Sequence, residues 1–219
     1  MPHADSLALP SSDLSKREFY NHVCSTAEAL LAPASETDPA ANWITVLSNA
    51  ASLLYGSYEN YAKHFGREDG RRVNWAGFYL IPSLMTRSAP ADAPSQLLLG
   101  PFHGRPACNS VSLRPASTSR PVGVCAAAYL AQETVVVEDV NARPGHIACD
   151  GVTQSEVVVP LTVRRRRQSP GGEVSEGEEE WQVGVLDIDC EGLAAFDEED
   201  REGLERFVDV LKRMIHWDA

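Results

Sequence analysis

The sequence predicts an α+β fold in which a central antiparallel sheet of about six strands carries the N- and C-terminal helices on one face. Two observations favour this class. Helical periodicity occupies both ends of the chain, and the middle consists of short β-branched and aromatic runs separated by turn residues. The length of 219 residues suits a single domain with elaborations. No repeat is evident within the chain.

The N-terminal third is expected to be helical after a short tail. Residues 1–15 are rich in Pro, Ser and Ala, which predicts a mobile N-terminal tail. Ser15 and Glu18 have the spacing of a capping box, so a helix should start at Lys16. A second helix is expected from about Trp43 to His64, because its apolar residues recur at helical spacing.

The pattern changes to that of strands from Val73 onward. A closing helix with an apolar stripe and acidic first turn should begin near Asp197. An irregular insertion is expected over 111–121 and a short alanine-rich helix over 126–132. The expected strands, of which the first two should form a hairpin, lie at 73–80, 96–102, 134–138, 156–163 and 181–189.

Charge and cysteine usage exclude several classes of function. The formal net charge of -12 argues against a nucleic acid or an anionic membrane as partner. No apolar run is long enough to span a bilayer, and the first residues do not resemble a secretory signal. Five cysteines without a CxxC pair indicate intracellular thiols, and no metal site is expected. The predicted location is the cytoplasm, with the nucleus also compatible.

A basic block at 164–167 faces an acidic block at 173–180 across a Ser-Pro-Gly-Gly turn. One interpretation is a nuclear-targeting or nucleic-acid patch. The other is a solvated hairpin whose two arms attract each other. The second is favoured because the acidic arm cancels the basic field locally.

Thiols, carboxylates and aromatic residues recur in the middle and C-terminal part of the chain. Carboxylates attract an amine, a thiolate attacks an electrophilic sulfur or carbon, and an aromatic wall packs a methyl group. Together they suit a small, amino-bearing, sulfur-containing substrate, although each also has an ordinary structural role. The candidates are Cys108, Cys125 and Cys149 on loops or helix starts, Glu156, Asp187 and Asp189 on strands, and Trp75 and Tyr79 on one strand face.

Six segments occur in an order that resembles the free methionine-R-sulfoxide reductases, a family of single GAF domains. The resemblance covers about 43–211. The segment between Cys108 and Cys125 is longer than is usual in that family, and Ala126 stands where a glycine is common. The segments are Asn-Trp-Ala-Gly-Phe-Tyr at 74–79, Gly-Pro-Phe-His-Gly-Arg-Pro-Ala-Cys at 100–108, Gly-Val-Cys at 123–125, Pro-Gly-His-Ile-Ala-Cys-Asp at 144–150, Ser-Glu-Val-Val-Val-Pro at 155–160 and Gly-Val-Leu-Asp-Ile-Asp at 184–189.

The resemblance implies one GAF domain over 16–219 with an N-terminal helical extension, usually in a homodimer. It implies reduction of free methionine-(R)-sulfoxide without a bound cofactor, with thioredoxin as reductant and NADPH consumed indirectly. Cys149 matches the catalytic cysteine, Cys108 the resolving cysteine and Cys125 a third, auxiliary one. The substrate-binding residues it implies are Trp75, Tyr79, Glu156, Asp187 and Asp189.

Two points stay open at this stage. Either Asp189 or Glu156 could protonate the sulfoxide oxygen, and either Cys108 or Cys125 could be the main resolving thiol.

A different class of function is also compatible with the fold, namely a GAF sensor that binds a small ligand, or a thiol redox switch, without catalysis. Against both, the chain contains no output domain for such a sensor to regulate.

Overall fold

The computed structural model describes residues 7–35, 37–86, 94–115, 117, 121–145, 151–168 and 174–217. Of residues 166–168 and 174–177 only the backbone is described. Within these ranges no helix is both long and apolar enough to cross a membrane. The expected α+β architecture is confirmed.

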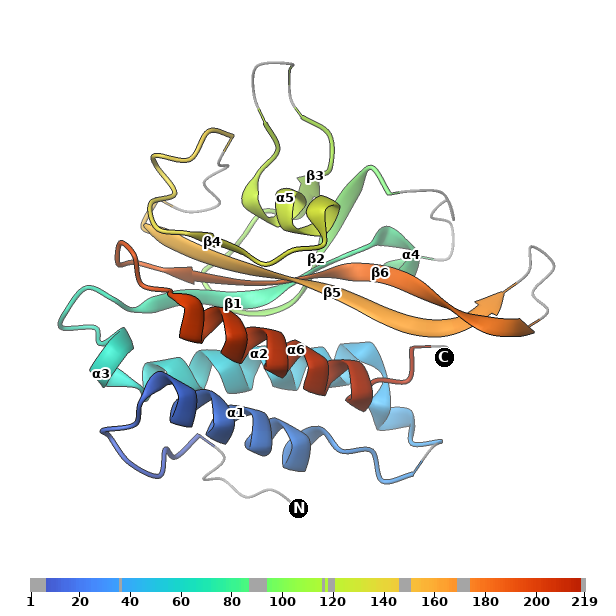
Figure 1. Cartoon of the computed structure of the whole chain (residues 1–219), viewed down its shortest axis with the longest axis horizontal. Helices are drawn as coiled ribbons and strands as arrows, with labels where there is room; N and C mark the ends of the chain where they lie inside the picture. Colours follow the sequence, from blue (N-terminus) through green and yellow to red (C-terminus); the bar gives the residue numbers. More distant parts are fainter. Residues whose placement is uncertain are drawn as a thin grey trace.

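A six-stranded sheet forms the middle layer, with the strand order β3-β2-β1-β6-β5-β4 and antiparallel pairing throughout (Figure 1). The expected hairpin of the first two strands is present. The strands are β1 (Val73–Leu80), β2 (Gln96–Gly104), β3 (Ser110–Ser112), β4 (Val135–Val137), β5 (Ser155–Gln168) and β6 (Val174–Cys190).

Three long helices lie on one side of this sheet, two of them against it and the third packed on those two, and one short helix lies on the other face (Figure 1). The three long ones are α1 (Lys16–Leu31), α2 (Trp43–Glu59) and α6 (Glu198–Met214), and the short one is α5 (Val124–Ala131). The smaller elements are the 3-10 turn η1 (Pro39–Ala41), α3 (Ala62–Phe65) and α4 (Pro82–Met85).

Each face of the sheet therefore has its own apolar core. The core under the long helices includes Phe19, Leu47 and Phe207, and the core under α5 includes Val124 and Tyr129. Every residue of β1 is buried, because both of its faces are covered. This explains why the strand reads as a continuous apolar run rather than an alternating one. The second, smaller core is the one that borders the candidate site.

Local signals placed the helix starts well, and tertiary context changed some ends. Ser15 and Glu18 form the expected capping box. The second helix ends at Glu59 and is followed by α3, so the expected single helix to His64 is two elements. The expected irregular insertion begins with the short strand β3, and the alanine-rich helix α5 starts two residues earlier than expected. Both differences come from pairing and capping that short propensity patterns do not encode.

The predicted N-terminal tail contacts the domain where it is described. Leu7, Leu9 and Leu14 pack against the larger core, the side-chain amide of Asn60 donates to the Leu7 carbonyl at 3.1 Å, and the Tyr61 hydroxyl donates to the Leu14 carbonyl at 2.8 Å. These contacts place residues 7–14 along α2 and α3.

The basic and acidic blocks form the hairpin arm predicted from their charges. Arg164 pairs with Glu180 and Arg165 with Glu179 across β5 and β6. The Arg165 Nε lies 2.7 Å from the Glu179 carboxylate, and its guanidinium lies 4.2 Å above the centroid of the Trp181 ring. The side chain of Arg165 is therefore held by contacts within the hairpin.

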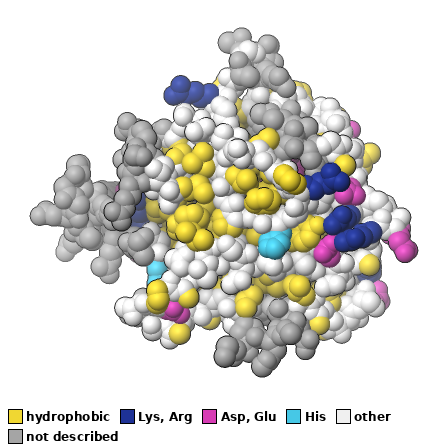
Figure 2. All heavy atoms as spheres, turned by 180° about the vertical axis from the view of Figure 1, so that it is seen from behind, with side chains coloured by type: hydrophobic (Ala, Val, Ile, Leu, Met, Phe, Trp, Pro, Cys, Tyr) yellow, Lys and Arg dark blue, Asp and Glu magenta, His cyan; other side chains and the backbone are white. Residues whose placement is uncertain are grey.

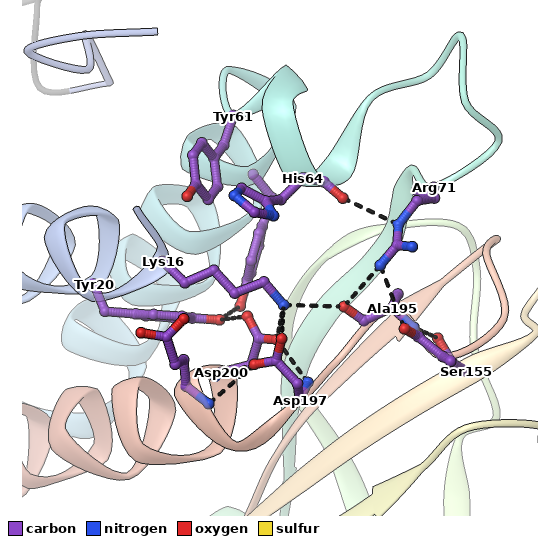
Figure 3. Close-up of polar contacts among 12 residues, drawn as sticks. Lys16, Tyr20, Tyr61, His64, Arg71, Ser155, Ala195, Asp197 and Asp200 are labelled. Atoms are coloured by element: carbon purple, nitrogen blue, oxygen red, sulfur yellow. Dashed lines mark hydrogen bonds and ion pairs between the residues drawn. The ribbon is translucent and has the colours of Figure 1, made fainter. Parts of the chain in front are cut away.

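A buried polar network joins the start of α1 to the start of α6 (Figure 3). Lys16 Nζ lies 2.8 Å from the Asp197 carboxylate and also contacts Asp200, which is fully buried. Burial is the main reason that the pKa of Asp200 is raised to about 6. Lys16 also donates to the Ala195 carbonyl at 3.4 Å, and the Ala195 N–H donates to the Ser155 hydroxyl at 3.3 Å. The network thus holds the first residue of β5, next to Glu156.

Seen from behind, apolar side chains gather in several patches on the surface (Figure 2). The large apolar side chains that are exposed in the described part of the chain are Ile44, Met85, Leu130 and Leu193.

Candidate active site

A cavity lies on the face of the sheet that carries α5, away from the long helices. It holds about 530 Å³ of empty space, including its opening to solvent. The lining residues come from five parts of the chain and are Tyr79, Cys108, Ser110, Val111, Gly123, Val124, Cys125, Thr153, Glu156, Asp187 and Asp189.

The strand register brings the three carboxylates to one place. Glu156 of β5 is directly opposite Asp189 of β6, and Asp187 lies two residues along the same face of β6. Glu156 and Asp187 are buried, with 4% and 5% of their surface exposed, and Asp189 is half-buried. Sequence parity predicted the shared face of Asp187 and Asp189. Parity could not predict the pairing of Asp189 with Glu156, because that pairing depends on the register between β5 and β6 along the whole hairpin.

Cys125 lies between two of these carboxylates. It occupies the first turn of α5, just after the N-cap Gly123. Its Sγ is 3.2 Å from Asp187 Oδ2 and 3.8 Å from Glu156 Oε1. The thiol can therefore donate to Asp187 and has a longer contact with Glu156. A hydrogen bond to a buried carboxylate stabilises an ion that burial alone disfavours.

Burial and mutual repulsion favour the protonated forms of these groups. Burial, followed by the charges of Asp187 and Asp189, raises the pKa of Glu156 well above its usual range. Burial also raises the pKa of Asp187 to about 7, although hydrogen bonds from Cys125 and Glu156 counteract this shift in part. Burial and the charges of Asp187 and Glu156 raise the pKa of the Cys125 thiol well above its usual range. The cavity thus contains a carboxylic acid at neutral pH and a neutral Cys125 thiol.

Asp187 keeps one oxygen without a partner. Its Oδ1 is buried and has no hydrogen-bond donor among the described residues. A buried carboxylate oxygen without a donor costs free energy unless something in the cavity provides one. An N–H or ammonium group of a ligand is a donor that fits this position.

Aromatic rings cover one side of the site. The Tyr79 hydroxyl donates to the Cys108 carbonyl at 3.0 Å, which holds the loop of that cysteine against β1. The Trp75 ring stacks on Tyr79 and on Phe102, with centroid distances of 5.8 and 5.6 Å. Gly77 leaves room for these rings, since a Cβ there would lie 2.3 Å from that of Phe102. Tyr79 lines the cavity, and Trp75 supports Tyr79 from the side.

The same cluster contains the atoms that a metal ion could use. Ligand atoms of Cys125, Glu156 and Asp187 all lie within 4.8 Å of one another. A thiolate and two carboxylates are possible zinc ligands, which the spacing of residues along the sequence did not suggest. In this structure the thiol is within hydrogen-bonding reach of both carboxylates.

Of the eight site residues expected from the sequence, six line one cavity. They are Tyr79, Cys108, Cys125, Glu156, Asp187 and Asp189. Trp75 lies beside the cavity rather than in its lining, and Cys149 falls outside the described residues. The most informative lining residue that the sequence did not single out is Thr153. Its place four residues after Cys149 was a signal that could have found it.

The fold and the cavity define a single GAF domain whose pocket combines thiols with carboxylates. A solved GAF domain structure has a TM-score of 0.70 and 34% sequence identity, covering 99% of this chain and 98% of that chain. A free methionine-R-sulfoxide reductase from Neisseria meningitidis, solved in complex with its substrate, has a TM-score of 0.64 and 33% identity, with 94% of each chain covered.

Relatives of known name agree with this class. The free methionine-R-sulfoxide reductase of Saccharomyces cerevisiae is 35% identical over 96% of this chain and 93% of the yeast protein. The Escherichia coli protein of the same name is 31% identical over 92% of each chain. No family model matches the sequence. The chain belongs to the free methionine-R-sulfoxide reductase family.

Proposed function

We propose that this protein reduces free L-methionine-(R)-sulfoxide to methionine with its own thiols as the immediate reductant. The observation that carries the proposal is one cavity lined by Cys108, Cys125 and three carboxylates. One of these carboxylates, Glu156, has a pKa raised well above its usual range. Membership of the family supports the same activity. No cofactor needs to be bound, because sulfur supplies the electrons.

In the proposed binding mode the cavity recognises two polar groups of the substrate, its ammonium group and its sulfoxide oxygen. The substrate ammonium group lies against Asp187 and Asp189, and it supplies a donor to the unpartnered Asp187 Oδ1. Protonated Glu156 donates to the sulfoxide oxygen and is the general acid, because burial and the charges of Asp187 and Asp189 raise its pKa well above the usual range. Tyr79, with Trp75 behind it, packs the substrate methyl group.

In the proposed cycle the sulfoxide oxygen passes to Cys149 and then leaves as water. The Cys149 thiolate attacks the sulfoxide sulfur while Glu156 protonates the oxygen, and methionine leaves with Cys149 as a sulfenic acid. The Cys108 thiol condenses with that sulfenic acid, so that a disulfide and one water form. Reduced thioredoxin regenerates both thiols by exchange and becomes oxidised, and NADPH re-reduces thioredoxin. The role of Cys149 rests on the family resemblance.

We assign resolution to Cys108 and a hydrogen-bonding role to Cys125. Cys108 is half-buried on a loop, whereas Cys125 is buried with a raised thiol pKa beside two carboxylates. A thiol in that environment is a poor thiolate, so it exchanges slowly. Its contact with Asp187 provides a hydrogen-bond donor to a buried carboxylate.

Serine and alanine at position 125 separate these two roles. Cys125→Ala should lower kcat/KM by about 10-fold, since it leaves a buried carboxylate without its donor. Cys125→Ser should recover most of that loss, because a hydroxyl donates the same hydrogen bond but forms no disulfide. Steady-state rates with thioredoxin measure both. Equal inactivity of the two variants, together with loss of the disulfide, would make Cys125 the resolving thiol instead.

Substrate selection tests the proposed function. We expect reduction of the free R epimer, no reduction of the free S epimer, and none of a sulfoxide within a peptide. The ammonium contact with the carboxylates requires a free amino group, and the general acid meets only one face of the sulfur. Methionine release can be followed for the three substrates under one thioredoxin system. Equal rates on peptide and free substrate would contradict the proposal, and binding without turnover is the result expected of a GAF sensor.

We also propose that the protein acts as a homodimer in the cytoplasm. The apolar patches on the face in Figure 2 offer surface for a second copy. The cytoplasm is proposed because the cycle needs free thiols between turnovers, and a reducing compartment keeps thiols reduced. Sedimentation at micromolar concentration distinguishes monomer from dimer.

A further inference from the structure

Asn74 connects β1 to the segment that enters β5. Its side-chain amide donates to the Thr153 hydroxyl at 2.9 Å, and both side chains are buried, with 1% and 7% of their surface exposed. Thr153 lines the cavity. The segment around it has further backbone support, because the Gln154 N–H donates to the Cys190 carbonyl at 2.8 Å. Asn74 therefore holds a wall of the cavity from the neighbouring strand.

The backbone of the same residue holds a second wall. The Arg105 N–H donates to the Asn74 carbonyl at 3.3 Å, at the point where β2 ends and the chain turns towards Cys108. Gly104 makes this approach possible, with a φ of 116° and no Cβ, which would lie 2.3 Å from the Asn74 oxygen. The far end of this loop is held by the bond from Tyr79 to the Cys108 carbonyl.

The position of Asn74 in the strand explains how one residue reaches both segments. The pairing of β1 with β6 shifts between Val73 and Trp75, so Asn74 lies at a bulge. A bulge redirects a side chain out of the regular alternation of a strand. A buried amide at such a place is stable only where it is hydrogen-bonded, and Thr153 accepts one of its protons.

From this geometry we infer that Asn74 is a positioning residue for the disulfide step. The inference rests on the proposed function, in which Cys108 condenses with the sulfenic acid of Cys149. Asn74 touches the segment that leads to Cys108 through its carbonyl, and it touches the cavity segment that follows Cys149 in sequence through its side chain. It therefore sets the relative placement of these two segments.

A double-mutant cycle tests this role. Asn74→Ala removes the donor, Thr153→Val removes the acceptor at nearly constant shape, and a third protein carries both changes. Each reduced protein is mixed with free methionine-(R)-sulfoxide without a recycling reductant. Methionine formed, disulfide formed and sulfenic acid trapped by a dimedone-type reagent are measured over time. Asn60→Ala, which removes a side-chain bond to the Leu7 carbonyl on the helical side, is the matched control.

We expect each single variant to slow disulfide formation by about 10-fold, the size of one lost buried hydrogen bond, while methionine forms with a smaller change. Trapped sulfenic acid should increase, and the double variant should lose less than the sum of the two single effects, because both changes remove the hydrogen bond that the two residues share. Thr153→Ser should recover most of the rate of disulfide formation that Thr153→Val loses. Asn60→Ala should give the same ratio of disulfide to trapped sulfenic acid as the wild type.

Two outcomes would overturn the inference. One is an unchanged partition between disulfide and sulfenic acid in Thr153→Val, which decides the matter even if Asn74→Ala fails to fold. The other is full additivity of the two single effects. Failure of the proposed function looks different, since the wild-type protein would then form no methionine.

Discussion

Replacement of Cys149 by serine is expected to abolish methionine formation, by a factor of at least about 1,000 in turnover. A serine hydroxyl remains protonated at neutral pH and cannot replace a thiolate as the nucleophile towards sulfur. The loss should persist with excess dithiothreitol, because no sulfenic acid forms for a reductant to repair. Amino-acid analysis of released methionine gives the rate directly.

Cys108→Ser and Cys24→Ser are the matched thiol controls. Cys108→Ser should lose turnover with thioredoxin and keep part of it with dithiothreitol, which reduces the sulfenic acid of Cys149 itself. Cys24 lies on α1, on the far side of the sheet from the cavity, and its thiol pKa is raised to about 11 by burial. Its replacement should leave both rates unchanged. Wild-type turnover by Cys149→Ser would contradict the assignment of the nucleophile.

Amide replacement of the carboxylates is expected to have the second largest effect. Glu156→Gln, Asp187→Asn and Asp189→Asn should each lower kcat/KM by at least about 10-fold, the lower limit for loss of a general acid or of a buried charged contact. Each amide keeps the shape of the acid and removes its charge and acidity. Asp209→Asn, an exposed change on α6, is the control and should behave as the wild type.

The pH profile distinguishes the acid from the other carboxylates. A general acid acts in its protonated form, so wild-type activity should fall as the pH rises through the raised pKa of Glu156. Glu156→Gln cannot lose a proton in this range, and this limb of its profile should be flat. If Asp189→Asn flattened that limb and Glu156→Gln did not, Asp189 would be the donor. Unchanged rates and profiles in all three variants would make the carboxylates structural.

The raised pKa of Asp187 affects stability with a defined sign. The folded protein binds a proton at Asp187 with a pKa of about 7, whereas an unfolded Asp has a pKa of about 3.9. Stability therefore falls as the pH rises between these two values, because the folded state must give up a proton that it holds more tightly. Asp187→Asn removes this cost, so its melting temperature should exceed that of the wild type by more at pH 8 than at pH 5.

Much of the fold could be predicted from local patterns. The capping box at Ser15, the β-branched runs and the apolar stripe of α6 each depend on residues close in sequence, and all three were correct. The break between α2 and α3 and the short strand β3 could not be predicted in this way. They depend on packing and pairing with distant segments, which override weak local propensity.

The candidate site divides in the same manner. Parity along one strand placed Asp187 and Asp189 together, residue chemistry singled out Glu156 and the thiols, and the motif resemblance gave these residues their roles. The placement of Cys125 beside two carboxylates required the fold, because α5 and β6 are about 60 residues apart in sequence. The role of Asn74 as an anchor was equally invisible, since its partners Thr153 and Arg105 belong to different loops.

A single-turnover experiment tests the central claim most directly. Fully reduced protein is mixed with excess free L-methionine-(R)-sulfoxide and no other reductant, and methionine and remaining thiols are counted. The account predicts about one methionine per chain with the loss of about two thiols, which appear as a disulfide between Cys149 and Cys108. No methionine, or an equal amount from the Cys149→Ser protein, would contradict it.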